Sequence, residues 1–133
     1  MPRQGFVPRE FRLMAIQRVA DSSPAAAVAL LRGTGPRLIF KHSPTCGISA
    51  GAFTEVSVFA DAHPELPIFL VDVVVQRGLS QQIAQELGVQ HASPQVILVA
   101  GGQPLWNASH RDVTVQAIEH ALGALLPPST PRV

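Results

Sequence analysis

Hydrophobic and polar positions along the chain follow two periods. Short apolar runs rich in β-branched residues, bounded by turn-forming residues, predict strands. The strands are expected at 11–19, 37–42, 66–75, 95–100 and 103–107. Other segments place apolar residues three or four positions apart, which predicts amphipathic helices. The helices are expected at 25–31, 46–60, 81–87 and 115–126.

Turn and cap residues sharpen these boundaries. Gly101-Gly102 predicts a two-residue hairpin turn into the last strand, where Pro104 fits best at a sheet edge. Ser80 is expected to cap the helix at 81–87, and Thr114 the closing helix.

The predicted order is β-α-β-α-β-α-β-β-α. Short loops join the strand at 37–42 to the helix at 46–60 and to the next strand, which predicts a right-handed βαβ unit with parallel strands. The fold class is therefore α/β and thioredoxin-like, with a central mixed sheet of four to five strands flanked by helices. This arrangement implies a cis bond at Ser93–Pro94, before the fourth strand.

Length and composition fit one globular domain. The chain has 133 residues, of which 47% are hydrophobic and 14% charged. We expect a flexible arm at 1–10, the domain at 11–126 and a flexible tail at 127–133.

Charge and hydropathy exclude several classes of partner. The formal net charge is +1, which gives no electrostatic case for nucleic acid or an anionic membrane. No apolar run approaches the roughly 20 residues of a membrane span, and the first residues lack the apolar core of a signal peptide. A lone cysteine suits a reducing compartment, so we expect a cytoplasmic protein.

The candidate chemistry lies at Cys46, the only cysteine. It follows a strand and a tight loop and opens a helix, where unpaired N–H groups and the helix dipole favour thiolate over thiol. The alternative is a small buried hydrophobic residue. Ser49 stands where a Cys-x-x-Cys site has its second thiol. Cys46 can thus attack a disulfide and carry a mixed disulfide, but it cannot close an internal one.

Neighbouring residues are candidates for stabilising the thiolate. Ile48 and Ser49 offer helix N–H groups, and Lys41 and His42 could supply positive charge, although both are also ordinary strand-end residues. The five histidines show no paired metal-ligand spacing, so no metal site is expected.

Several separated motifs, in this order, resemble those of the monothiol bacilliredoxins, thioredoxin-fold proteins of the bacillithiol system. The motifs are Lys41-His42-Ser43, Thr45-Cys46, Ile48-Ser49, Leu79-Ser80, His91, Ser93-Pro94-Gln95 and Ser109-His110. The chain departs from the family pattern at Gly47, where proline is usual, and at Ala92, where glutamate is usual. Gly47 gives a more flexible first turn.

The resemblance implies a thiol-disulfide oxidoreductase. Cys46 would remove bacillithiol from S-thiolated client proteins and become bacillithiolated itself, with a second low-molecular-weight thiol regenerating it. Bacillithiol is then a co-substrate, no cofactor is bound, and the protein is a monomer. Thr45, Gly47, Ser93 and Pro94 are the expected substrate-binding residues. Arg77, expected in the loop after the third strand, could bind a carboxylate of the small thiol.

A second interpretation comes from Cys46-Gly47-Ile48-Ser49, one residue away from the Cys-Gly-Phe-Ser signature of monothiol glutaredoxins. Those proteins hold a [2Fe–2S] cluster between two protomers, with one thiolate from each. That function would be binding and delivery of a cluster. Lys41 suits either interpretation, whereas the Ser-Pro-Gln and Ser-His motifs favour the bacilliredoxin.

Overall fold

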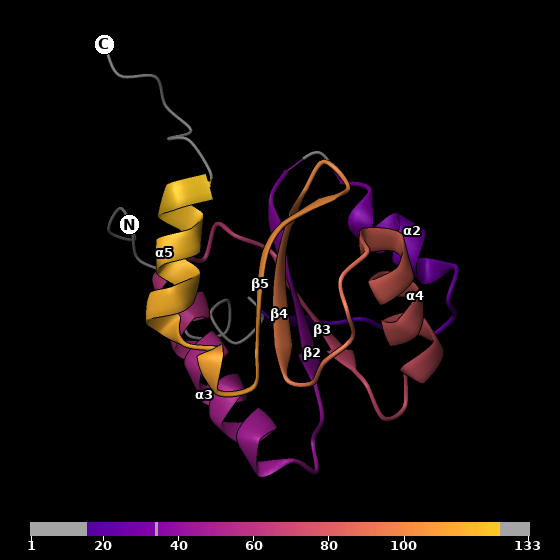
Figure 1. The fold of residues 1–133 in the computed structure, drawn as a ribbon, viewed down its shortest axis with the longest axis horizontal. Coiled ribbons are helices and arrows are strands. Elements are labelled where there is room, and N and C mark those ends of the chain that lie inside the picture. Colours follow the sequence, from indigo (N-terminus) through magenta and orange to yellow (C-terminus); the bar gives the residue numbers. More distant parts are fainter. Residues whose placement is uncertain (1–15, 34, 126–133) are drawn as a thin grey trace, which may run out of the picture.

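The structure is a computed structural model that describes residues 16–33 and 35–125 (Figure 1). Its elements in chain order are β1 (Ile16–Arg18), α2 (Ala26–Leu31), β2 (Arg37–His42), α3 (Gly47–Ala62), β3 (Ile68–Asp72), α4 (Arg77–Leu87), β4 (Gln95–Ala100), β5 (Gln103–Ser109), η1 (His110–Asp112) and α5 (Val115–Leu125). The predicted arm, the first half of the first predicted strand, residue 126 and the predicted tail lie outside the described residues.

The strands form one mixed sheet in the order β1-β3-β2-β4-β5. β3 runs parallel to β1 and β2, whereas β4 runs antiparallel to β2 and β5. The predicted parallel β2-α3-β3 unit and the mixed sheet are therefore confirmed. Pro104 lies on β5, an outer strand of the sheet, as predicted.

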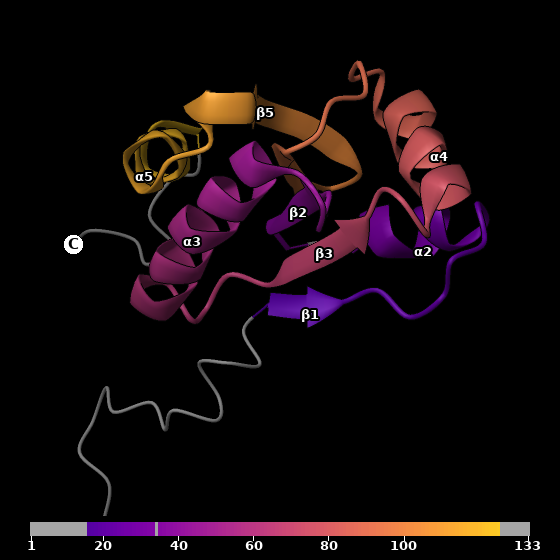
Figure 2. The ribbon, with the colours of Figure 1, turned by 90° about the horizontal axis from the view of Figure 1, so that it is seen from below.

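Helices cover both faces of the sheet. Figure 2 shows α3 and α5 on one face and α2 and α4 on the other. Alternation along β2 divides its side chains between the two cores: Leu38 and Phe40 pack toward α3 and α5, and Ile39 packs toward α2 and α4. Positions 38, 40 and 42 of β2 thus share one face, and positions 39 and 41 share the other.

The prediction was wrong where β3 meets α4. β3 ends at Asp72, because the Asp72 carboxylate accepts hydrogen bonds from the N–H groups of Val74 (2.9 Å) and Val75 (3.1 Å) and turns the chain. α4 then begins at Arg77. Arg77 is consequently a helical residue and not a loop residue, and Ser80 lies buried inside the helix instead of capping it.

Other turns and caps agree with the sequence. Gly101 and Gly102 both have positive φ, 59° and 76°, which the tight hairpin requires. The Thr114 hydroxyl accepts a hydrogen bond from the Ala117 N–H at 3.1 Å, as expected of an N-cap. β5 is two residues longer than predicted and ends at Ser109.

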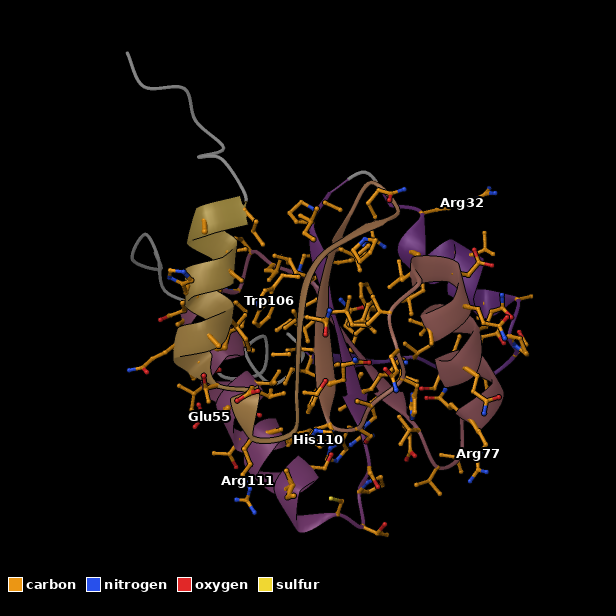
Figure 3. The ribbon with its side chains drawn as sticks, in the orientation of Figure 1. Arg32, Glu55, Arg77, Trp106, His110 and Arg111 are labelled. Carbon is orange, nitrogen blue, oxygen red and sulfur yellow. The ribbon has the colours of Figure 1, made fainter. Side chains whose placement is uncertain are left out.

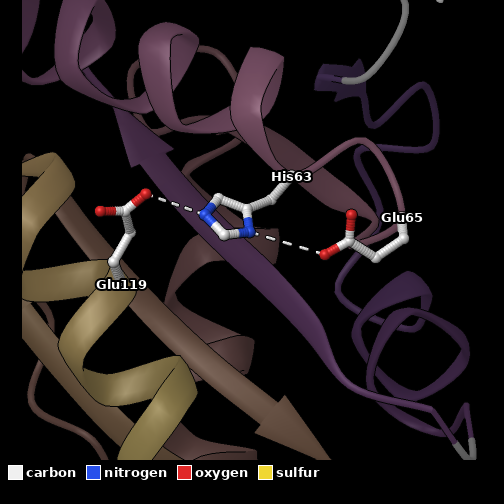
Figure 4. Close-up of polar contacts among 3 residues, drawn as sticks. All are labelled: His63, Glu65 and Glu119. Atoms are coloured by element: carbon white, nitrogen blue, oxygen red, sulfur yellow. Dashed lines mark hydrogen bonds and ion pairs between the residues drawn. The ribbon is translucent and has the colours of Figure 1, made fainter. Parts of the chain in front are cut away.

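A histidine links the two helices on the α3 face. His63 follows the last turn of α3, and its Nε2 lies 2.9 Å from the Glu119 carboxylate on α5 (Figure 4). Its Nδ1 lies 3.6 Å from the Glu65 carboxylate. The ring also stacks on Phe59, at 4.5 Å between centroids. The contact between His63 and Glu119 ties the far end of α3 to α5.

Candidate active site around Cys46

The sheet register brings three loops to one end of the molecule. Lys41 near the end of β2 pairs with Gln95 at the start of β4, and Gln95 pairs with Ser109 at the end of β5. The loop after β2, the segment before β4 and the segment after β5 therefore emerge together. Figure 3 shows His110 and Arg77 at this same end. Cys46, Ser93 and His110 consequently belong to one candidate site.

Cys46 occupies the N-cap position of α3, as predicted. Its backbone is extended (φ −103°, ψ 129°), and the residue is partly exposed. The Cys46 carbonyl accepts the N–H of Ala50 at 3.0 Å, which is the first bond of the helix. The three preceding helical residues, Gly47, Ile48 and Ser49, are therefore the positions whose N–H groups have no acceptor within α3.

Gly47 lies in open space at the start of α3. Apart from its chain neighbours and the backbone of its own helix, no atom of the described residues lies within 4 Å of a Cβ placed here, and the φ of Gly47 is not positive. Packing therefore does not require glycine here, and a first-turn proline would also fit this position of a helix. Thr45 and Ile48, on either side of the Cys46–Gly47 pair, are exposed.

The Ser49 hydroxyl fixes the loop that carries Cys46. Ser49 is fully buried, and its Oγ accepts the N–H of Ser43 at 2.9 Å. The same Oγ lies 3.1 Å from His42 Nδ1, to which its hydroxyl hydrogen can be donated. One side chain thus connects the end of β2, the loop and the first turn of α3.

His42 lies in an apolar setting on the α3 face. Its ring packs against Phe40 and Phe53, at 5.5 and 5.2 Å between centroids. Burial lowers the pKa of His42, Arg18 lowers it further, and Asp72 partly opposes both. The shift favours the neutral ring, so the structure works against the positive charge that the sequence interpretation gave to His42.

Lys41 points to the opposite face of the sheet, toward α4. It is fully buried, and its ammonium donates a hydrogen bond to the Ser80 carbonyl at 3.0 Å. The Lys41 Nζ also lies 3.2 Å from His91 Nδ1. Burial lowers the pKa of Lys41 to about 8. Proximity in sequence predicts that Lys41 stabilises the Cys46 thiolate. Alternation along β2 instead places Lys41 on the α4 face, where its partners are Ser80 and His91.

The segment before β4 has the predicted geometry. The Ser93–Pro94 peptide bond is cis, and Pro94 is buried. The Pro94 carbonyl accepts the N–H of His110 at 2.8 Å, which joins this segment to the turn after β5. His110 has a φ of 56°, an uncommon value for a residue with a side chain.

Arg77 lines a cavity at the start of α4. The cavity measures about 310 Å³ and is also lined by Val73, Val74, Ser80 and His91. The exposed guanidinium is available there to an anionic group. Ser80 and His91 were not among the predicted site residues, and only their place in the family motifs pointed to them.

The described residues contain neither a cluster of metal-binding side chains nor a helix suited to a membrane. Within 16–33 and 35–125, no group of three or more His, Cys, Asp or Glu residues could hold a metal ion. None of the helices in the described part of the chain is long and apolar enough to cross a membrane.

Comparison with known structures defines the class of protein. A solved structure described as having a thioredoxin fold is 27% identical, with a TM-score of 0.74, and the match covers 84% of this chain and 96% of that one. Thioredoxin O2 from Arabidopsis thaliana is 20% identical, with a TM-score of 0.64 and coverage of 86% and 97%. Thioredoxin f2 from Chlamydomonas reinhardtii is 10% identical, with a TM-score of 0.65 and coverage of 86% and 99%. The fold is that of the thioredoxin-like oxidoreductases, as predicted.

The family follows from a second comparison. Residues 18–118 match the family model described as "Monothiol bacilliredoxin BrxC". The chain therefore belongs to the monothiol bacilliredoxin family, which confirms the resemblance seen in its motifs.

Proposed function

We propose that this protein removes bacillithiol from protein mixed disulfides through Cys46. The observation that carries the proposal is the position of the only thiol in the chain. Cys46 is partly exposed at the N-cap of a 16-residue helix, in a member of the monothiol bacilliredoxin family. Such a thiol can exchange with a disulfide but has no second thiol in the chain to resolve the product.

The reaction is two thiol–disulfide exchanges. The Cys46 thiolate attacks the bacillithiol sulfur of the client mixed disulfide. The client–bacillithiol S–S bond breaks, and the client leaves as a thiolate that takes a proton from water. Cys46 then carries bacillithiol. The thiolate of a second bacillithiol attacks that bacillithiol sulfur, which releases the Cys46 thiolate and forms bacillithiol disulfide. The client sulfur is reduced to a thiol, and the second bacillithiol, which enters as a free thiol, is oxidised as it joins the first in the disulfide.

The surrounding residues have separate roles in this proposal. The N–H groups of Ile48 and Ser49 stabilise the Cys46 thiolate, which is the nucleophile of the first exchange and the leaving group of the second. The backbone at Ser93 and the exposed loop at Thr45 hold the client. The cavity beside Arg77 receives a carboxylate of the small thiol. The protein acts as a cytoplasmic monomer and needs no bound cofactor.

Intact mass spectrometry tests the reaction directly. A client protein bearing one bacillithiol is incubated with the reduced protein, and both masses are followed over time. We expect the client to lose bacillithiol as Cys46 gains it. Cys46→Ser should abolish the transfer. The double variant Cys46→Ser/Ala124→Cys is the matched control, because it carries its thiol on an exposed residue of the last turn of α5.

Two outcomes would overturn the proposal. One is transfer of glutathione from a glutathionylated client with none from the bacillithiolated client. The other concerns cluster carriage: if anaerobic reconstitution with iron, sulfide and bacillithiol gives a brown dimer that Cys46→Ser cannot form, delivery of a [2Fe–2S] cluster becomes the better account.

A further inference from the structure

His91, in the segment before β4, connects the protein interior to the cavity beside Arg77. Its Nδ1 lies 3.2 Å from the Lys41 ammonium and 3.2 Å from the Ser80 hydroxyl. The residue is nevertheless exposed, and it lines the cavity of about 310 Å³. One edge of the imidazole therefore faces buried polar groups, and the rest of the ring is open to the cavity.

Lys41 determines which ring nitrogen of His91 carries the hydrogen. A pKa of about 8 keeps Lys41 charged at neutral pH. An ammonium group has three N–H donors and no acceptor, so the nitrogen that contacts it, Nδ1, must accept. Burial and the Lys41 charge also lower the pKa of His91, which disfavours a second proton on the ring. The single ring hydrogen is consequently on Nε2.

The Nε2–H donor of His91 has no acceptor within residues 16–33 and 35–125. All of the hydrogen bonds that its side chain makes there involve Nδ1. No Asp or Glu lines the cavity. Asp72, which precedes the lining residue Val73, already accepts the N–H groups of Val74 and Val75 with its carboxylate. The Nε2–H is therefore available to a ligand.

Arg77 supplies further donors at the same cavity. It is the first residue of α4 (Figure 3), whereas His91 belongs to the segment before β4, so the donors come from two separate elements. The Arg77 guanidinium is exposed and has no ion-pair partner in the described part of the chain. Donors on two elements, with no carboxylate among the lining residues, suit an anion with two oxygen atoms.

We propose that the His91 Nε2–H and the Arg77 guanidinium together hold one carboxylate of the small thiol. The inference rests on the proposed function, which gives this carboxylate to Arg77 alone. An anion held from two elements is fixed in direction as well as in place. Both elements meet at the end of the sheet that carries the Cys46 loop, so the contact aligns the sulfur of the bound molecule relative to Cys46.

The kinetic test uses two substitutions of His91 that each keep one polar edge of the ring. Asparagine places its amide where Nδ1 lies, so His91→Asn keeps the contact with Lys41 and removes the donor at the cavity. Glutamine places its amide where Nε2 lies, so His91→Gln keeps that donor. In transfer of bacillithiol from a client to Cys46, His91→Asn should raise KM about tenfold, as expected for one lost hydrogen bond to a charged group, with kcat unchanged.

His91→Gln should keep the KM of the wild-type protein. His120→Asn is the matched control, because His120 is also an exposed histidine but lies on α5, on the other face of the sheet. Its KM should not change. The inference is overturned if His91→Asn has the wild-type KM, or if His91→Gln loses as much as His91→Asn.

A binding test separates the inference from the proposed function. S-methyl bacillithiol, which cannot exchange, and its carboxyl methyl esters are titrated into the ¹⁵N-labelled wild-type protein. Long-range ¹H–¹⁵N spectra report which ring nitrogen of His91 carries the hydrogen. We expect Nε2 to carry it, and we expect the acid, but not the esters, to shift the signals of His91 Nε2 and Arg77 Nε.

The outcomes of the titration are distinct. A hydrogen on Nδ1 of His91 overturns the inference, as do equal shifts with the acid and the esters. If only the acid shifts the signals but no bacillithiolated client reacts, the proposed function fails and the carboxylate site stands. If clients react but the signals stay unmoved, the carboxylate site fails alone.

Discussion

Lys41 should make the stability of the fold depend on alkaline pH. It is the only lysine in the chain, and the sequence contains no tyrosine. Burial lowers its pKa from 10.5 to about 8 in the folded protein. Between pH 8 and pH 10.5, Lys41 is therefore protonated in the unfolded chain and neutral in the folded one. The free energy of unfolding must then rise with pH across this window, and the contribution disappears as pH falls through 8.

The expected size follows from the two pKa values. The gap between about 8 and 10.5, at 1.36 kcal/mol per pKa unit, corresponds to about 3 kcal/mol. The slope within the window is about 1.4 kcal/mol per pH unit. Lys41→Met keeps most of the side-chain volume and removes the titrating amine, so it should remove this rise.

Urea unfolding at a series of pH values between 7 and 11 measures the effect. The experiment uses Cys46→Ser as the reference protein, because this variant has no thiol that could oxidise during unfolding. Lys41→Met is added to that background, which leaves the α-amino group as a term common to both. A flat free energy of unfolding in the reference protein would refute the reasoning, as would the same slope in both proteins.

Three further predictions concern Ser49 and His42 at the start of α3 and the contact between His63 and Glu119 at its far end. Ser49→Ala leaves the Ser43 N–H without its acceptor and should lower the free energy of unfolding by about 1–3 kcal/mol in urea titrations; an unchanged midpoint would mean that the loop holds without it. Because burial lowers the pKa of His42, the protein should lose stability as pH falls below 6.5, and His42→Phe should lessen that loss; equal losses would argue against it. Glu119→Gln weakens the partly exposed contact with His63 and should cost at most about 1 kcal/mol by thermal melting; a cost well above this would indicate a stronger ion pair.

The sequence was most informative where one local signal decides the structure. The strands at 37–42 and 95–100 have the predicted bounds, because each is an apolar run closed by turn residues. The region after β3 was harder. Val73, Val74 and Val75 have high strand propensity, yet the Asp72 side chain turns the chain before they can extend the sheet. Local hydrogen bonding overrode propensity there.

The candidate site also contains features that the local sequence predicts and features that depend on distant contacts. Cys46 at a helix start could be predicted from the strand, loop and helix around it. The environment of Lys41 could be inferred only by following alternation along β2, which puts it on the α4 face. Its partners, Ser80 and His91, lie 39 and 50 residues further along the chain. The hydrogen bond from the Gln95 amide to the Gln90 carbonyl is likewise one that no periodicity reveals.

The Ser49 hydroxyl also bears on how this protein could acquire a second redox thiol. A single substitution, Ser49→Cys, would create the spacing of a two-cysteine site. The same change would replace the oxygen that accepts the Ser43 N–H with sulfur, which is a weak acceptor. The γ atom of residue 49 would have to be sulfur to resolve a disulfide, but oxygen to hold the Cys46 loop through the Ser43 N–H. An evolutionary path between one-cysteine and two-cysteine relatives would need the loop around Ser43 to change together with position 49.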